Sequence, residues 1–385
     1  MKKLIRITTV PISLDKLLSG QMKYMSSFYD VTAVSSDPPA LDKIAEKEGV
    51  KVFSVEMTRK ITPLQDLKAV FKLAAFLRKE KPLIVHTHTP KAGLVGMMAA
   101  KMAKVPHRLH TVAGLPLLEA KGKKRQLLDR VEKFTYRCAT KVYPNSYGLL
   151  EIIKKNNYCR PEKLKVLANG SSNGIDTKHF SNAHFSAEAN AALKKSLRIS
   201  DTDIVFIFVG RLVSDKGLNE LAKAFEPLHA KMPQVKLLLV GNFENDLDPL
   251  SEATMKIFNQ NHGVISAGYQ NDVRPYFAIS DALIFPSYRE GFPNVVMQAG
   301  AMDLPAIVSN INGCNEIINE GVNGNIIPVK DAEAIYKAME KMAVDVAYRE
   351  KLTTNARNLI VTRYEQQVVW DAIREEYLNF EKSAK

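Results

Sequence analysis

Residues 204–218 read Ile-Val-Phe-Ile-Phe-Val-Gly-Arg-Leu-Val-Ser-Asp-Lys-Gly-Leu, an apolar run followed by a glycine, a basic loop and a second glycine. The run 204–209 is rich in β-branched and aromatic residues, which predicts a buried strand. A helix is expected to begin near Gly217. A strand, a tight loop and a helix make the first half of a βαβ unit, so this stretch predicts a parallel α/β sheet.

The same alternation of short apolar runs and longer helical patterns extends over the whole chain and predicts the α/β class. In the second half, strands are expected at Ile204–Val209, Lys236–Val240, Val264–Ala267, Ala282–Phe285, Ala306–Ser309 and Gly324–Pro328. In the first half they are expected at Leu4–Thr9, Asp30–Ser35, Val50–Ser54, Leu83–His86, Arg108–Thr111, Lys141–Pro144 and Lys165–Ala168. A helix is expected over residues 62–81, with an apolar face made of Leu67, Val70, Phe71, Ala74 and Leu77.

The length of 385 residues is more than one hydrophobic core usually organises. The polar stretch 169–176, rich in Gly, Asn and Ser, interrupts the alternation and is typical of a loop between domains. We therefore expect one domain over residues 1–175, a second over residues 195–365, and a cleft between them.

The net charge of +13 is concentrated in the first part of the chain. Residues 1–180 contain 33 Lys and Arg against 15 Asp and Glu, whereas residues 181–385 contain 21 against 26. A basic half indicates an acidic partner: nucleic acid, an anionic membrane surface or a phosphorylated small molecule. No apolar run is long enough to span a membrane, so any membrane contact is expected to be peripheral. The three cysteines show neither disulfide nor zinc spacing.

Arg211 and Lys216 follow the strand 204–209 directly, at the carboxyl end of the sheet, where ligands bind in parallel α/β proteins. A guanidinium, an ammonium and a helix start are together suited to a phosphate. The alternative is a solvated loop that carries two ordinary surface cations.

A second motif, residues 285–300, reads Phe-Pro-Ser-Tyr-Arg-Glu-Gly-Phe-Pro-Asn-Val-Val-Met-Gln-Ala-Gly. It starts at another strand end and enters a helix near Asn294. Glu290, between aromatic residues and next to a glycine, is suited to accepting hydrogen bonds from sugar hydroxyls, and the helix amides are suited to phosphate oxygens. Alternatively, Gly291 and Pro293 only shape a turn.

The two motifs together resemble the retaining, nucleotide-sugar-dependent glycosyltransferases of family 4, which have the GT-B fold of two Rossmann-like domains. The resemblance implies that Arg211 and Lys216 neutralise the donor diphosphate and that Glu290, the first acid of the family's E-x7-E motif, contacts the donor sugar. The second acid is replaced by Gln298, which keeps an acceptor oxygen without the charge and is expected to bind ribose more weakly. The remaining donor-binding residues that it implies are Gly210, Tyr269, Gln270, Gly291, Phe292, Pro293, Asn294 and Val295.

In the first domain the resemblance is to bacterial members that extend undecaprenyl-diphosphate-linked oligosaccharides. The expected acceptor-side residues are Ser13, Gly20, Gln21, Thr89 and Lys91. Members often carry a histidine in a Thr-Val-His-Gly segment, where this chain has Ala113, so His110 is only a weak catalytic candidate. The resemblance also implies that a C-terminal helix, about residues 366–385, packs back on the first domain.

No metal and no cofactor are expected. His86 and His88 lack a carboxylate or cysteine partner, so one is expected to pack in the core and the other to face the cleft. The pairs Asp201 with Asp203 and Asp246 with Asp248 only superficially match the metal-binding DxD motif of the other glycosyltransferase fold, and solvated turns are the expected role.

Residues 117–141 combine eight Lys and Arg with apolar residues at helical spacing. Such a basic amphipathic helix is suited to an anionic lipid surface. The alternative, weighed nearly equally, is a core-packed helix with a solvated basic face. Nucleic acid is not favoured, because no aromatic interleaving or DNA-reading motif accompanies the charge.

The leading hypothesis is therefore retaining transfer of a sugar, a hexose or N-acetylhexosamine, from a nucleoside diphosphate donor, UDP being expected, to a polyprenyl-diphosphate-linked saccharide. The expected location is cytoplasmic, peripheral on the inner face of the cytoplasmic membrane, through the basic N-terminal half. The alternatives are a GT-B nucleotide-sugar epimerase and a non-catalytic basic nucleic-acid-binding protein.

Overall fold

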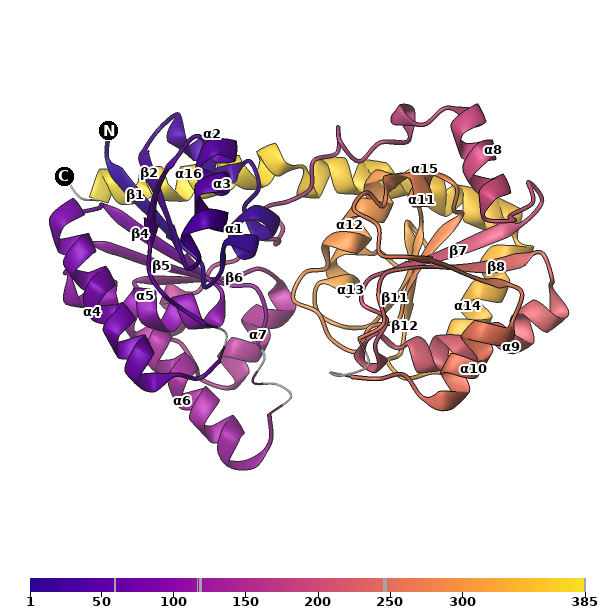
Figure 1. Cartoon of the computed structure of the whole chain (residues 1–385), viewed down its shortest axis with the longest axis horizontal. Coiled ribbons are helices and arrows are strands. Elements are labelled where there is room, and N and C mark those ends of the chain that lie inside the picture. Colours follow the sequence, from indigo (N-terminus) through magenta and orange to yellow (C-terminus); the bar gives the residue numbers. More distant parts are fainter. Residues whose placement is uncertain (59, 116, 118–119, 245–247, 384–385) are drawn as a thin grey trace. The chain divides into compact units, whose positions relative to one another are not determined.

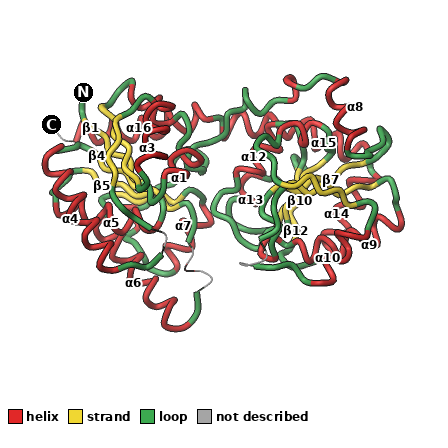
Figure 2. Tube along the Cα trace, in the orientation of Figure 1, coloured by secondary structure: helices red, strands yellow, loops and turns green. Residues whose placement is uncertain are grey.

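A computed structural model describes residues 1–58, 60–115, 117, 120–244 and 248–383. The chain forms two compact units, one made of Met1–Gly174 with Gln367–Lys385 and the other of Ile175–Gln366 (Figure 1). Each unit consists of a central sheet with helices on both of its faces (Figure 2). Among the described residues, no helix combines the length and apolar character needed to cross a lipid bilayer.

The first unit contains a six-stranded parallel sheet in the order β3-β2-β1-β4-β5-β6. Its strands are β1 (Lys3–Ile7), β2 (Asp30–Ser35), β3 (Lys51–Ser54), β4 (Ile84–His88), β5 (His107–Val112) and β6 (Lys141–Pro144). Side chains alternate between the two faces of a strand, so each strand supplies apolar residues to two separate cores.

One face of this sheet is covered by α4 (Pro63–Glu80), α5 (Pro90–Met102) and α6 (Gly122–Cys138), which share a core with Ile5, Ile7 and Val85. The other face is covered by α1 (Pro11–Leu17), α2 (Gln21–Ser26), α3 (Pro38–Glu48) and the C-terminal α16 (Gln366–Ser383), around Leu4 and Ile84. Beyond β6 follow α7 (Tyr147–Lys155) and the short 3-10 helix η2 (Pro161–Lys163).

Helix α16 also satisfies buried polar groups of the first unit. Arg6 of β1 is only 1% exposed, and its guanidinium donates to the Tyr377 hydroxyl at 2.7 Å and to Gln21. The same hydroxyl lies 2.6 Å from Nδ1 of His86. A buried guanidinium needs such partners, because an unpaired buried charge is strongly destabilising.

The second unit contains a six-stranded parallel sheet in the order β12-β11-β10-β7-β8-β9. Its strands are β7 (Ile204–Val209), β8 (Val235–Val240), β9 (Val264–Gly268), β10 (Ala282–Phe285), β11 (Ala306–Ser309) and β12 (Gly324–Ile327). Its helices are η3 (Asn182–His184), α8 (Ala187–Ser196), η4 (Ser214–Lys216), α9 (Leu218–Lys231), α10 (Glu252–Gln260), α11 (Arg274–Ala278), α12 (Asn294–Ala301), α13 (Cys314–Ile317), α14 (Ala332–Val344) and α15 (Val346–Tyr364). Because β7 and β10 are neighbours, the loops that follow them leave the same edge of the sheet.

Two expectations are wrong. Residues 165–168 form no strand: after one bridge between Leu164 and Val142, the chain turns away at Ala168, whose φ of 49° is incompatible with a strand. The helix expected at 62–81 is α4, but Leu67 and Phe71 of its expected apolar face are 47% and 55% exposed.

Candidate active site

The two motif loops of the second unit are packed directly on each other. Gly217, with φ of 74°, begins α9, and a Cβ built on it would lie 2.1 Å from the carbonyl oxygen of Pro286, which follows β10. Only glycine permits both this left-handed backbone and this close approach. This close backbone contact holds the loop after β7 against the loop after β10.

This contact brings Lys216 and Glu290 into a partly buried ion pair. Their side chains are 14% and 18% exposed, and the same carboxylate oxygen accepts a hydrogen bond from Ser287 Oγ at 3.0 Å. Ser287 is itself fully buried, so it holds Glu290 in one orientation. The sequence motif contained Ser287, but nothing in the pattern assigned this role to it.

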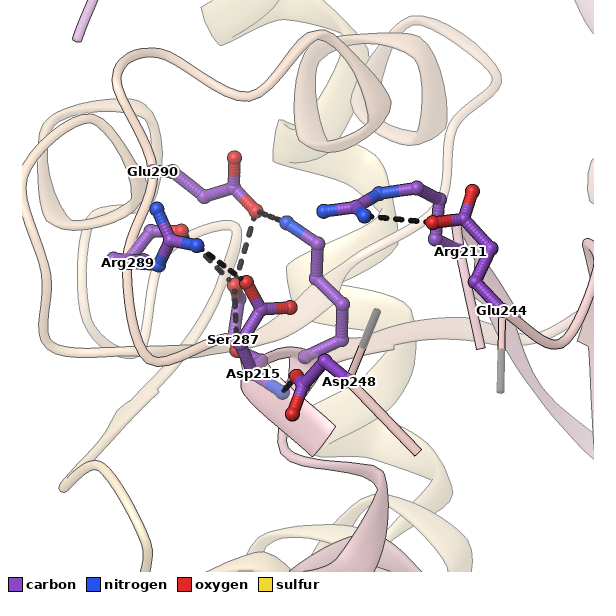
Figure 3. A network of polar contacts seen from close by, with 8 residues as sticks. Arg211, Asp215, Glu244, Asp248, Ser287, Arg289 and Glu290 are labelled. Atoms are coloured by element: carbon purple, nitrogen blue, oxygen red, sulfur yellow. Dashed lines mark hydrogen bonds and ion pairs between the residues drawn. The ribbon is translucent and has the colours of Figure 1, made fainter. Parts of the chain in front are cut away.

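Two further ion pairs flank this contact. Arg211 donates to Glu244 at 2.9 Å, and Arg289 donates to Asp215 at 2.8 Å (Figure 3). Both arginine side chains are about half exposed, at 48% and 49%. The hydrogen bond to Glu244 raises the pKa of the Arg211 guanidinium, which therefore stays charged at any physiological pH. Sequence reasoning missed Arg289, Asp215 and Glu244, because the paired residues lie 33 and 74 positions apart in the sequence.

The sequence predicted a solvated turn at Asp248, but this residue connects its loop to the loop after β7. Its carboxylate accepts the amide of Asp215 at 2.6 Å. The other aspartate of this DxD pair, Asp246, lies outside the described residues. Asp201, whose side chain is 90% exposed, matches the expected solvated turn. Asp203 does not, because its side chain is only 9% exposed and its carboxylate accepts the amide of Ser200 at 2.7 Å.

Three cations thus converge at the carboxyl ends of β7 and β10, and each pairs with a carboxylate. Such an arrangement is suited to a ligand that is anionic at one end and rich in hydroxyls at the other. The anion replaces the carboxylates as the partner of Arg211 and Lys216, and the released Glu290 carboxylate accepts hydrogen bonds from the hydroxyl groups. The buried thiol of Cys314 is no nucleophile here, because burial and then the charge of Glu290 raise its pKa.

The loop between Glu290 and α12 is held in place by its backbone. Asn312 donates to the carbonyl of Glu290 and, at 3.2 Å, to that of Gly291, while Phe292 and Pro293 are buried. Asn312 was not found from the sequence, since it lies outside both motifs. Gly210 donates its amide to Val240 at 3.0 Å at the end of β7.

The first turn of α12 begins at the exposed Asn294, followed by the half-buried Val295. The first amides of a helix have no acceptor within it and are suited to anions. Gln298, one turn further on, is half-buried. The loop after β9 presents Tyr269, which is 64% exposed, and Gln270, whose amide donates to the carbonyl of Ala267 at 2.7 Å.

Of the expected acceptor-side residues, three lie near strand ends of the first unit. Ser13 is half-buried on α1. Thr89 follows β4 with φ of 81°, a strained value for a residue other than glycine, and its hydroxyl lies 2.8 Å from that of Thr9. Lys91, in the first turn of α5, pairs with Asp66 at 2.5 Å.

The other candidate residues of the first unit lie in packed surroundings. Gln21 is fully buried and hydrogen-bonded to Arg6 and Asn173, so its side chain is not exposed to an acceptor substrate. Gly20 packs on the Trp370 ring. His110 is 2% exposed, with Nδ1 2.8 Å from the Thr87 hydroxyl, and burial lowers its pKa to about 4. Gln21 and His110 are therefore packed in the core of the first unit, whereas Gly20 is half-buried and stays a predicted acceptor-side residue.

His86 and His88 are both buried, at 1% and 2% exposure, although the sequence predicted that only one of them packs in the core. Within the described part of the chain, no cluster of three or more His, Cys, Asp or Glu side chains is arranged to hold a metal ion.

Two family models match this chain. Residues 190–359 match the glycosyl transferases group 1 model, and residues 22–170 match the glycosyl transferase 4-like domain. Two parallel α/β units with these matches define a glycosyltransferase of the GT-B fold. The chain belongs to this family, which confirms the resemblance to family 4 and decides against the epimerase and the nucleic-acid-binding protein.

The similarity to individual members extends over the whole chain. The protein is 33% identical over 385 residues to the capsular polysaccharide biosynthesis glycosyltransferase CapM of Staphylococcus aureus, covering 100% of this chain and 99% of the relative. It is 28% identical, over 97% of both chains, to the UDP-Gal:alpha-D-GlcNAc-diphosphoundecaprenol alpha-1,3-galactosyltransferase of Escherichia coli. A solved structure of Anabaena HepE with UDP and glucose superposes with a TM-score of 0.80 at 18% identity, covering 98% of this chain and all of the other, which confirms the fold.

Proposed function

We propose that this enzyme transfers a sugar, with retention of configuration, from a UDP-sugar to a saccharide linked to a polyprenyl diphosphate, during assembly of a surface polysaccharide. The observation that carries the proposal is the Lys216–Glu290 pair with Arg211 beside it, held at the carboxyl ends of two neighbouring strands. In this assignment Arg211, Lys216 and the first amides of α12 bind the diphosphate, and Glu290 accepts hydrogen bonds from the sugar.

The electrostatics support departure of a nucleoside diphosphate. Charge develops on the leaving phosphate in the transition state, and fixed donors at that position stabilise it without reorganisation. Lys216 is only 14% exposed and is braced by Glu290 and the aromatic ring of Phe285 at 5.8 Å, so its ammonium is positioned before the donor binds. In the proposed step the acceptor hydroxyl attacks the front face of the sugar, the bond to the leaving phosphate breaks, and that phosphate takes the hydroxyl proton.

The nature of the acceptor and donor is supported by the relatives. The Escherichia coli enzyme, by its name, uses UDP-galactose and a diphosphoundecaprenol-linked sugar. A relative from Campylobacter jejuni, 28% identical over 329 residues, with 82% of this chain and 85% of the relative covered, is an N-acetylgalactosaminyltransferase that acts on a diphospho-undecaprenol-linked saccharide. We extend the same acceptor class, and a hexose or N-acetylhexosamine donor, to this enzyme without assigning it a metal.

The experiment is transfer from UDP- and GDP-hexoses and N-acetylhexosamines to polyprenyl-diphosphate-linked monosaccharides, with the anomeric configuration of the product read by NMR. Lys216→Met is expected to lower kcat by about 10²–10³-fold, the usual effect of losing one transition-state donor. Glu290→Gln keeps an acceptor oxygen but loses the charge, and it is expected to lower kcat/KM by about 10- to 100-fold. Matched controls are Lys223→Met and Glu226→Gln on the exposed face of α9, which are expected to leave kcat/KM unchanged.

Transfer from UDP-sugars with a product of the donor's configuration supports the proposal. Inversion of configuration contradicts the retaining assignment, and a preference for GDP-sugars contradicts the UDP assignment. Activity insensitive to both motif variants contradicts the site.

A further inference from the structure

The outward face of α4 is unusual for a helix on a protein surface. Its exposed residues include Leu64, Leu67 and Phe71, at 80%, 47% and 55%, and Ile61 just before the helix is 64% exposed. They are spaced three or four residues apart and so form one stripe. The exposed charged side chains of the same helix are all basic: Lys68, Lys72, Arg78 and Lys79.

Helix α6 repeats this composition. Leu127 and Phe134, two turns apart, are 50% and 42% exposed. The exposed charged side chains over residues 120–140 are again all basic: Lys121, Lys123, Lys124, Arg130, Lys133 and Arg137.

The two helices flank α5 on the same face of the first sheet, where all three share one core (Figure 1). The acidic side chains on α4 and α6 do not offset the exposed cations. Asp66, Glu80 and Asp129 are at most 30% exposed, and each is paired with a cation, while Glu132 is buried. Within residues 60–81 and 120–140, which the structure describes, no Asp or Glu is exposed.

An ordinary solvated face in the same unit looks different. The exposed side chains of α3 include Asp42, Lys43, Glu46 and Lys47, which mix both signs and contain no large apolar residue among them. Leu and Phe side chains ringed only by cations are suited to a surface that is apolar inside and anionic outside, which is the chemistry of a bilayer with acidic lipids.

We propose that the outward faces of α4 and α6 form a docking surface for an anionic lipid bilayer, with Leu64, Leu67, Phe71 and Phe134 entering the headgroup region and the lysines and arginines contacting lipid phosphates. The inference deepens the proposed function, because a polyprenyl-linked acceptor is presented by a membrane. The sequence-based expectation concerned only the basic segment 117–141, and the structure adds α4 to it.

The test is cosedimentation of the full chain with vesicles of phosphatidylcholine alone or with phosphatidylglycerol added. Each cation removed is expected to weaken binding to anionic vesicles about fivefold, so Lys68→Gln with Lys72→Gln lowers the partition coefficient about 25-fold. Leu67→Gln with Phe71→Gln is expected to lower it at least tenfold. The matched controls in the second unit, Lys223→Gln with Lys256→Gln and Val344→Gln with Val346→Gln, are expected to bind like the wild type, because all four positions are exposed there.

A second measurement reports insertion directly. Phe71→Trp is expected to shift its emission to the blue on anionic vesicles, whereas Val344→Trp is expected not to shift, and the single native Trp370 supplies the same background in both. Equal binding to neutral and anionic vesicles, no binding, or a loss at Leu67 and Phe71 no larger than in the controls overturns the proposal. Turnover of the donor with a water-soluble acceptor analogue, measured without vesicles, separates this result from failure of the proposed function.

Discussion

The Arg211–Glu244 pair predicts a variant that binds its donor more tightly than the wild type. The Arg211 guanidinium is bonded to Glu244 at 2.9 Å, so a diphosphate that binds this guanidinium has to replace the carboxylate. Glu244→Gln removes the competing charge and leaves a side chain of the same size. The free energy of donor binding then improves by the amount that the Arg211–Glu244 pair contributed.

The magnitude follows from the exposure of the two side chains. At 48% and 33% exposed, the pair is screened by solvent and contributes about 0.2–1 kcal/mol. Converted to an equilibrium constant, the donor KM is expected to fall by about 1.5- to 5-fold, with kcat little changed. The fall should shrink as salt is added, because screening weakens the original competition.

The assay is initial-rate kinetics with varied UDP-sugar at low and high ionic strength, with Glu252→Gln on the exposed start of α10 as a charge-matched control. A rise in KM for Glu244→Gln would refute the reasoning, since it would mean that Glu244 itself binds the donor. An equal fall in the control would show a general effect of net charge.

Three further outcomes are expected. Tyr377→Phe leaves the buried Arg6 guanidinium without its 2.7 Å partner and should destabilise the first unit by about 2–3 kcal/mol, seen as a lower urea midpoint. Gly217→Ala should lower the free energy of unfolding by more than about 2 kcal/mol and remove most of the activity. Gly49→Ala, with φ of 68° but open space around it, should lower the free energy of unfolding by only about 1 kcal/mol. Equal effects of the two variants on thermal unfolding would contradict the packing argument. Burial raises the pKa of Glu132 from its ordinary 4.5 to about 7, so the folded state keeps this carboxyl protonated at pH values where the unfolded chain has released the proton. The stability of the folded state is therefore full below about pH 4.5 and falls as the pH rises through about 7. Glu132→Gln should accordingly raise the melting temperature at pH 8 and not at pH 4.

Strand positions were predictable because a buried parallel strand is a short, nearly continuous apolar run between polar loops, and that signal is local. The motif loops were predictable for a related reason. Gly210 and Gly217 mark turns, and the cations between them follow a strand end, where the fold places ligands. The resemblance to a known family then supplied roles that the spacing alone left open.

The errors have a different physical origin, since they concern contacts between distant parts of the chain. Gln21 is buried because Arg6 needs an acceptor, and no local pattern reports that need. His110 lies on a strand face that α5 covers at Gly93, where a Cβ would meet the imidazole ring at 2.4 Å. Phe71 has the spacing of a core residue, but the curvature and packing of neighbouring helices decide which side of an apolar face is covered.

The noncontiguous first unit, completed by α16, affects the order in which the protein folds during synthesis. Val369, Ile373 and Tyr377 belong to the core that surrounds Leu4 and Ile84, so that core stays incomplete until Tyr377 has been translated. At about 5–20 residues per second, the roughly 190 residues between the two segments take about 10–40 s. The second unit, encoded without interruption, can fold during that interval, while the nascent first unit exposes an apolar sheet face. A ribosome-bound chain that stops before Val369 is therefore expected to be the species that chaperones bind.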